Sequence, residues 1–251
     1  MPTDTRRQTK RERLAARRAA EAAARARAER RRRTILGGVV GGLVVLVALV
    51  VVIVVQSHRT STSATAASPP GSTDGVFVVG STSAPVTVDL YEDFQCPNCK
   101  AFEAESGATI AQLVAAGTVQ AHYHGMAFLD TSANDQYSTR ALNAAAAVFA
   151  AGGPTAFQKF HDLLFTHQPA EGGSGLTDDQ LVQYATQAGA TGASVKQAVT
   201  GLKYGDWVKN ATYRASKDGV TGTPTVFVAG KKLADISAAG LTAAVSAAAG
   251  S

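Results

Sequence analysis

Short runs of β-branched and aromatic residues predict strands in the part of the chain that follows residue 75. Residues 76–80 (VFVVG), 86–91 (VTVDLY) and 118–125 (TVQAHYHG) have this character, which is typical of β-strands. Residues 96–117 instead carry helix formers, with Pro97 in the first turn and a glycine at the end, a pattern that indicates a helix. The order β-β-α-β is therefore expected here.

A long helical block follows the third predicted strand. Its segments show helical spacing or strong helix formers, and glycine and proline separate them: 141–153, 154–167, 176–189 and 194–219. Residues 223–235 then predict a β-hairpin with its turn at AGKK, and residues 241–250 a helix of small residues. Because the sheet resumes after the helices, we predict one α/β domain at residues 76–251, with an inserted helical subdomain at about residues 130–219.

An uncharged apolar run precedes this domain. Residues 35–55 form a run of 21 residues without a single charge, and about 20 apolar residues suffice for a helix to span a bilayer. Four arginines, residues 30–33, lie just before the run, and a Lys/Arg excess marks the cytoplasmic side. We therefore predict an uncleaved single-pass anchor with the N-terminus in the cytoplasm and the rest of the chain exported. The alternative is a cleaved signal peptide, for which the ATA at residues 64–66 resembles a cleavage site.

The charge is divided unevenly along the chain. Residues 1–34 form a basic tail with 13 Lys/Arg and 4 Asp/Glu, whereas the remainder holds 11 basic and 15 acidic residues. Residues 56–75 are rich in Ser, Thr, Ala and Pro and predict a flexible linker. Since the predicted domain is mildly acidic, it offers no basic face for nucleic acid.

Both cysteines of the chain lie in the stretch DFQCPNCK, as Cys96 and Cys99. A predicted strand runs into Cys96 and a predicted helix runs out of it. The free N–H groups and the dipole at the helix N-terminus stabilise a thiolate on Cys96, and Cys99, one turn further in, is placed to act as the resolving thiol. A structural disulfide across two residues closes a very short loop and stabilises little, so a redox pair is the favoured interpretation.

A metal site is the alternative from another class of protein. His122 and His124 alternate on a predicted strand, so their side chains point to one face. Together with Cys96 and Cys99 they would supply the four ligands that a structural zinc site needs, and the protein would then be a metal-binding carrier. The spacing does not match the usual zinc motifs.

The CPNC motif after an aromatic-rich strand, together with TGTPTVFV downstream, resembles the DsbA-like thiol:disulfide oxidoreductases, which have a thioredoxin-like fold. The resemblance extends over residues 76–251 and includes the helical insertion. It implies that Thr223 and Pro224 form a cis-proline loop beside the cysteines, where the residue before the proline presents its backbone to substrate. It further implies that Pro97 and Asn98, between the cysteines, tune the redox potential.

Two positions depart from the pattern of that family. Asn98 stands where the best-known oxidase has histidine, so we expect a milder oxidant. Many thioredoxin-fold enzymes carry a buried acid six residues before the first cysteine, and here that residue is Leu90. Glu92 and Asp93 are the nearby candidates for a proton relay.

The combined prediction is a membrane-anchored, extracytoplasmic enzyme that forms disulfides in unfolded or cysteine-containing exported proteins. The resemblance implies reoxidation by a quinone-linked thiol oxidase of the membrane. No cofactor or resident metal is expected, and a monomer is favoured. A disulfide reductase or isomerase using the same cysteine pair is the alternative within this class.

Overall fold

The computed structural model describes residues 66–72 and 75–250. The predicted basic tail, the predicted anchor at residues 35–55 and most of the predicted linker lie outside these residues. Within the described ranges, no helix has the length and apolar character required to cross a membrane.

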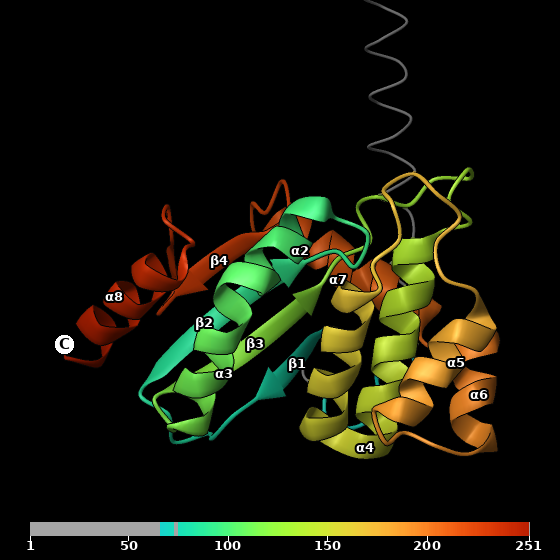
Figure 1. Cartoon of the computed structure of the whole chain (residues 1–251), viewed down its shortest axis with the longest axis horizontal. Helices are drawn as coiled ribbons and strands as arrows, with labels where there is room; N and C mark the ends of the chain where they lie inside the picture. Colours follow the sequence, from blue (N-terminus) through green and yellow to red (C-terminus); the bar gives the residue numbers. More distant parts are fainter. Residues whose placement is uncertain (1–65, 73–74, 251) are drawn as a thin grey trace, which may run out of the picture. The chain divides into compact units, whose positions relative to one another are not determined.

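A five-stranded sheet forms the centre of the domain, with the strand order β1-β3-β2-β4-β5 (Figure 1). The three predicted strands of the first half are confirmed as β1 (Val76–Val79), β2 (Val86–Glu92) and β3 (Val119–Gly125). The predicted hairpin is confirmed as β4 (Thr225–Val228) and β5 (Lys231–Lys232). Strands β2 and β3 are parallel, and β1 and β4 run antiparallel to their neighbours. The strand that carries the cysteine motif therefore lies in the middle of the sheet.

The helix after β2 runs without a break but changes from α-helical to π-helical and back to α-helical. It comprises α2 (Pro97–Phe102), a π-helical segment η1 (Glu103–Gly107) and α3 (Ala108–Ala115). The last helix, α8 (Ala238–Ala249), begins three residues earlier than predicted because the Ser237 hydroxyl caps it by accepting from the Gly240 N–H at 3.2 Å. Figure 1 shows α2 and α3 in front of the sheet.

The predicted helical insertion between β3 and β4 is confirmed. It contains α4 (Tyr137–Thr166), α5 (Asp178–Gln187), α6 (Ala193–Thr200) and α7 (Gly205–Lys217). The predicted break between residues 153 and 154 is a kink inside α4, where Gly153 adopts φ 66° before Pro154. The prediction of one helical stretch over 194–219 was wrong, because Leu202 adopts φ 48° and separates α6 from α7.

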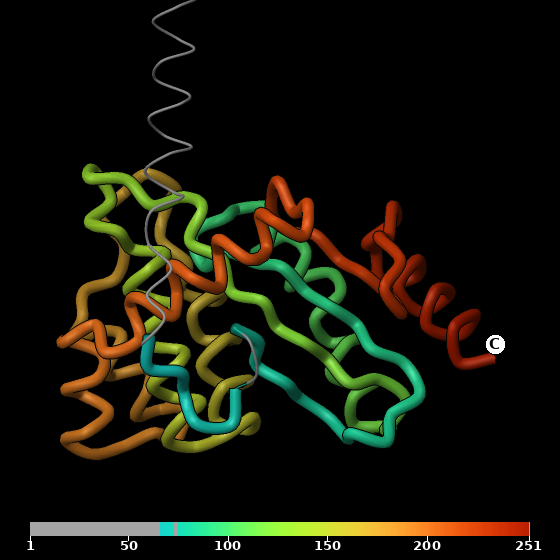
Figure 2. Tube along the Cα trace, turned by 180° about the vertical axis from the view of Figure 1, so that it is seen from behind, coloured from blue at the N-terminus to red at the C-terminus, as the bar shows by residue number. Residues whose placement is uncertain are grey.

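The two faces of the sheet differ in burial. On one face Val88, Leu90, Ala121 and Val226 are buried in the main core. The other face carries a smaller apolar cluster that includes Tyr91, beneath the end of α7, and Figure 2 shows the α7 segment on this side of the strands. Much of the second face stays half-exposed, whereas the cysteine motif lies beyond the end of β2.

Candidate active site

Cys96 occupies the position expected from the sequence, as the N-cap residue of α2 with Pro97 next in the chain. The carbonyl of Cys96 accepts from the N–H of Cys99 at 3.1 Å and from that of Lys100 at 3.2 Å. Both cysteines are free thiols. Cys96 is 7% exposed and Cys99 is fully buried, while Pro97 and Asn98 between them are exposed. A partner therefore reaches the pair from the side of Cys96.

The two thiols have very different acidities. A hydrogen bond from the Cys99 thiol is the largest cause that lowers the pKa of Cys96. Burial opposes it, but hydrogen bonds from the Thr223 side chain and from the N–H groups of Asn98 and Cys99 help to bring the Cys96 pKa down to about 5. Burial raises the pKa of Cys99 far above its usual value, and the hydrogen bond to Cys96 and the charge of Glu92 raise it further. At neutral pH the reduced pair therefore holds one thiolate and one thiol.

The Thr223-Pro224 loop lies directly beside Cys96, although 127 residues separate it from the cysteine. The Thr223–Pro224 peptide bond is cis, as the family resemblance implied. Cys96 Sγ lies 3.4 Å from the Thr223 carbonyl oxygen, to which it donates when it is protonated. The antiparallel pairing of β4 with β2 holds this loop at the same end of the sheet as the cysteine motif.

Asp93 is the acid nearest to the cysteines in the sequence, but both oxygens of its carboxylate accept hydrogen bonds from residues around it. One oxygen accepts from the Gln95 N–H at 2.9 Å and from the Ser138 hydroxyl at 2.6 Å. The other oxygen accepts from the Leu129 N–H at 3.1 Å. Burial raises the pKa of Asp93 to about 6 despite these hydrogen bonds. We therefore interpret this carboxylate as the group that holds the β2–α2 turn in place.

Two amide side chains that the sequence did not single out support the cysteine turn. Gln168 donates to the Cys96 carbonyl at 2.9 Å. The buried Gln95 donates to the carbonyls of Ala170 and Gly173 at 3.2 and 2.9 Å. These contacts attach the loop after α4 to the turn, so the helical insertion helps to position the cysteines.

A buried group of two acids and a histidine acts on Cys99 through the charge of Glu92. Glu92, at the end of β2, bonds His161 of α4 through its Oε2 at 3.1 Å, and both side chains are almost fully buried. Glu103 of η1 belongs to the same group. Burial opposes the charged form of His161, but the charge of Glu103 and hydrogen bonds to Asp162 and Glu92 raise its pKa. Burial and the charge of Glu92 raise the pKa of Glu103.

Of the two acids proposed for a proton relay, Glu92 has the suitable surroundings. Its negative charge acts on Cys99, and its Oε1 is buried without a hydrogen-bond partner in the described part of the chain. His161 was missed in the sequence analysis. The available signal was its place in an apolar helical stripe with Phe157, Phe160 and Leu164, since a buried histidine there requires a polar partner.

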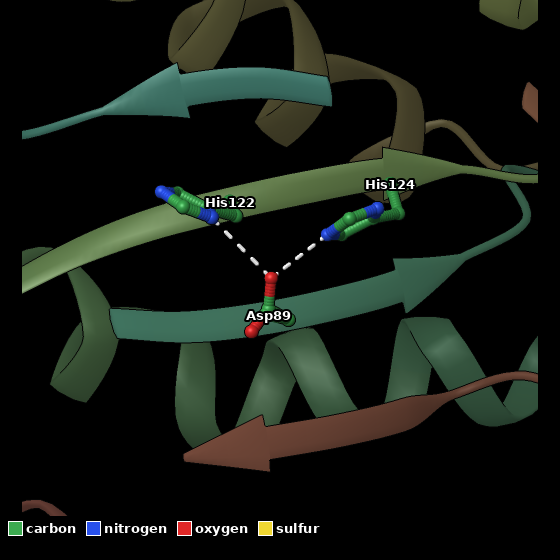
Figure 3. A group of neighbouring side chains, drawn as sticks. All are labelled: Asp89, His122 and His124. Carbon is green, nitrogen blue, oxygen red and sulfur yellow. Dashed lines mark hydrogen bonds and ion pairs between the residues drawn. The ribbon is translucent and has the colours of Figure 1, made fainter. Parts of the chain in front are cut away.

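The predicted alternative of a Cys2His2 metal site is wrong. His122 and His124 do project from one face of β3, but their nitrogens converge on Asp89 of β2 (Figure 3). In the residues that the structure describes, this trio and the buried group of Glu92, Glu103 and His161 are the candidate metal-ligand clusters, and neither includes a cysteine. Burial opposes ionisation of Asp89, but hydrogen bonds from both histidines lower its pKa well below the usual range.

Comparison with known proteins agrees with this geometry. A family model described as Thioredoxin matches residues 72–247. The structure is similar to that of an oxidised DsbA from Mycobacterium tuberculosis, with a TM-score of 0.62 and 32% identity, over 70% of this chain and 93% of that one. This chain belongs to the thioredoxin family, among the DsbA-like thiol:disulfide oxidoreductases. A reduced DsbG from the same organism has a TM-score of 0.60 and 32% identity, over 76% of this chain and 86% of that one.

The chain is also similar to part of a much longer curated protein. The serine/threonine-protein kinase PknE of Mycobacterium tuberculosis is 32% identical over 161 residues, which are 61% of this chain and 28% of that protein. The chain thus spans less than a third of the length of this relative.

Proposed function

We propose that this DsbA-like chain forms disulfides in exported proteins by exchange through Cys96 and Cys99. In the oxidised enzyme, a substrate thiolate attacks Cys96 Sγ, the Cys96–Cys99 bond breaks, and Cys99 leaves with the electron pair and takes a proton. A second substrate thiolate then attacks the substrate sulfur of the mixed disulfide, and Cys96 leaves as a thiolate. The substrate dithiol loses two electrons and two protons, and the enzyme pair gains the electrons.

The position of Cys96 at the N-cap of α2, beside Cys99 and the Thr223 loop, carries the proposal for this direction, because these neighbours lower its pKa to about 5. A thiol of low pKa is a good leaving group, so Cys96 departs readily in the second step. Stabilising its thiolate also stabilises the reduced enzyme, which makes the disulfide form a stronger oxidant. The value lies between about 7 for thioredoxin and about 3.5 for DsbA, which supports an oxidant milder than the latter.

The substrate-binding role of Thr223 and Pro224 follows from their position. Both residues are half-exposed beside Cys96, and an extended substrate segment can pair with backbone groups that it reaches. We propose that the Thr223 backbone aligns the substrate so that its sulfur approaches Cys96 Sγ.

Glu92 completes the proposed reaction as the proton relay for Cys99. Because burial makes a Cys99 thiolate unfavourable, the departing sulfur must be protonated at once, and it must lose that proton again when the enzyme is reoxidised. The carboxylate of Glu92 has one buried oxygen without a hydrogen-bond partner among the described residues, and His161 orients the other. We propose that Glu92 gives and takes this proton while His161 balances its charge.

The proposed cellular setting derives from residues 1–55. The uncharged run at 35–55 and the arginines before it support a single-pass anchor with the catalytic domain outside the cytoplasm, where disulfides persist. We propose reoxidation by a quinone-linked thiol oxidase in the same membrane. Labelling of Cys96 in intact, reduced cells with a membrane-impermeant thiol reagent tests the location. Labelling only after cell lysis would contradict it.

Oxidative refolding of reduced ribonuclease tests the activity. The wild-type chain should accelerate the appearance of ribonuclease activity, and Cys96→Ser should abolish the effect. Lys100→Ala serves as the control, because it alters an exposed neighbour on the same helix and should keep the wild-type rate. Equal rates for the wild type and Cys96→Ser would overturn the proposal. Faster reduction of insulin than oxidation of ribonuclease would contradict the oxidising direction.

A further inference from the structure

We propose that Asp89, His122 and His124 form a binding site for one Zn²⁺ ion on the half-exposed face of the sheet, apart from the cysteine chemistry. Sheet geometry brings the three residues together. Asp89 of β2 is directly opposite His122 in the parallel register, and His124, two residues further along β3, points to the same face. Figure 3 shows both imidazole rings converging on one oxygen of Asp89.

The three ligand atoms are close enough for a zinc ion to enter after a small side-chain adjustment. His122 Nδ1 and His124 Nε2 lie 3.3 and 2.9 Å from Asp89 Oδ1. Zinc binds nitrogen and oxygen at about 2.0–2.2 Å, so a tetrahedral site spaces its ligand atoms about 3.3–3.6 Å apart. The 3.3 Å contact already has this spacing, and the 2.9 Å hydrogen bond would lengthen by about 0.4 Å around an ion. The side chains of Asp89, His122 and His124 are 22%, 25% and 20% exposed. An ion can thus enter from solvent, and a fourth position remains for water.

The hydrogen bonds of Gln120 support a cation at this place. Its Nε2 donates to the Ser81 carbonyl at 3.2 Å, which orients the amide so that Oε1 faces His122 Nε2 at 2.9 Å. That oxygen can only accept, so the proton of neutral His122 is on Nε2. In this neutral form the lone pair of His122 Nδ1 points at an Asp89 oxygen that also only accepts, so the hydrogen bond from His122 to Asp89 exists only when the ring carries a second proton. Two acceptors 3.3 Å apart require a proton or a metal ion between them.

The surroundings also preorganise the second histidine. The Tyr91 ring stacks on His124 with centroids 4.1 Å apart and an interplanar angle of 16°, and the Tyr91 side chain is itself buried. Metal-binding histidines commonly use their second ring nitrogen in a hydrogen bond that fixes the orientation of the ring. Here Gln120 fixes one ring through its nitrogen and Tyr91 fixes the other by stacking. Two imidazoles and one carboxylate are ligands that suit zinc.

Equilibrium dialysis of the untagged full-length chain against Zn²⁺ tests the proposal. The cysteines are first oxidised to the disulfide so that they cannot bind the metal. The wild type should bind one zinc ion per chain, and Co²⁺ in place of zinc should give the visible absorption of a tetrahedral site. Asp89→Asn and the double variant His122→Ala/His124→Ala should lose this binding. His167→Ala, which removes an exposed histidine outside the cluster, should bind like the wild type.

A second variant separates the loss of a ligand from a failure to fold. Gln120→Ala leaves the three ligands in place and should weaken zinc binding by about 10–100-fold, as is usual for a residue that orients a ligand. All variants should keep wild-type thiol-exchange activity, which shows that they are folded. The proposal is overturned if the wild type binds no zinc, or if Asp89→Asn and the double histidine variant bind it as tightly as the wild type. The second result would indicate that the trio is only a hydrogen-bonded network.

Discussion

Replacing Cys99 by alanine should raise the pKa of Cys96 by removing the hydrogen bond that lowers it most. Because its own pKa is held high by burial, the Cys99 thiol remains protonated and acts as a donor over the whole range in which Cys96 titrates. A hydrogen bond to a charged group contributes about 1.5–3 kcal/mol, and one pKa unit corresponds to about 1.4 kcal/mol. The expected rise is about 1–2 units, from about 5 in the wild type to about 6–7 in Cys99→Ala.

The ultraviolet absorbance of the thiolate, followed against pH in the reduced protein, measures this shift. Cys99→Ser is the matched control, since its hydroxyl can still donate to Cys96 and should keep the pKa within about one unit of the wild type. Identical titrations of the wild type and Cys99→Ala would refute the role of the Cys99 thiol. An equal rise in both variants would attribute the effect to packing around the buried position.

Three further predictions concern the buried groups and the thiolate. Glu92→Gln should slow reoxidation of the reduced enzyme by oxidised glutathione about 100-fold, as loss of a general base does, whereas the exposed Glu105→Gln should not, and equal rates would remove Glu92 from the relay. His161→Ala should lower the free energy of unfolding by about 3–5 kcal/mol in urea titrations. The loss should be greatest below pH 6.5 and shrink as the pH approaches about 10, because the pKa of His161 is raised by folding. The reduced form should gain stability over the oxidised form by about 1.4 kcal/mol per pH unit between the folded Cys96 pKa of about 5 and its ordinary value of 9.0, and a flat difference over this range would contradict the lowered pKa.

The parts of the fold that could be predicted from the sequence are those that depend on local patterns of residues. The alternation in β2 and the helix signals around Pro97 placed Cys96 at an N-cap, because both depend on residues close together in the chain. The glycine and proline at 153 and 154 likewise marked the kink in α4. The separation of α6 from α7 was not visible in this way, since the Tyr204 N–H bonds the buried Asn143 side chain at 2.8 Å, a contact across 61 residues.

The same distinction between local patterns and long-range contacts applies to the candidate site. The cysteines and the proline loop were predicted because a motif and a resemblance mark them. The Glu92–His161 pair joins residues 69 apart, and the pairing of Asp89 with His122 depends on the register of two parallel strands. Neither distance is visible in a single sequence. The π-helical segment was hidden too, because its composition is that of an ordinary helix, although its turn carries Glu103 to the buried cluster.

The reduction potential of the Cys96–Cys99 pair tests the central claim most directly. A Cys96 pKa of about 5 lies between the values of thioredoxin and DsbA, whose potentials are about −270 and −120 mV. We therefore predict a potential between these two values, above that of thioredoxin. Equilibration of the purified full-length chain with glutathione buffers of known poise gives the value. A potential clearly above about −270 mV and below about −120 mV is the predicted result, and one near −270 mV or below would contradict an oxidase.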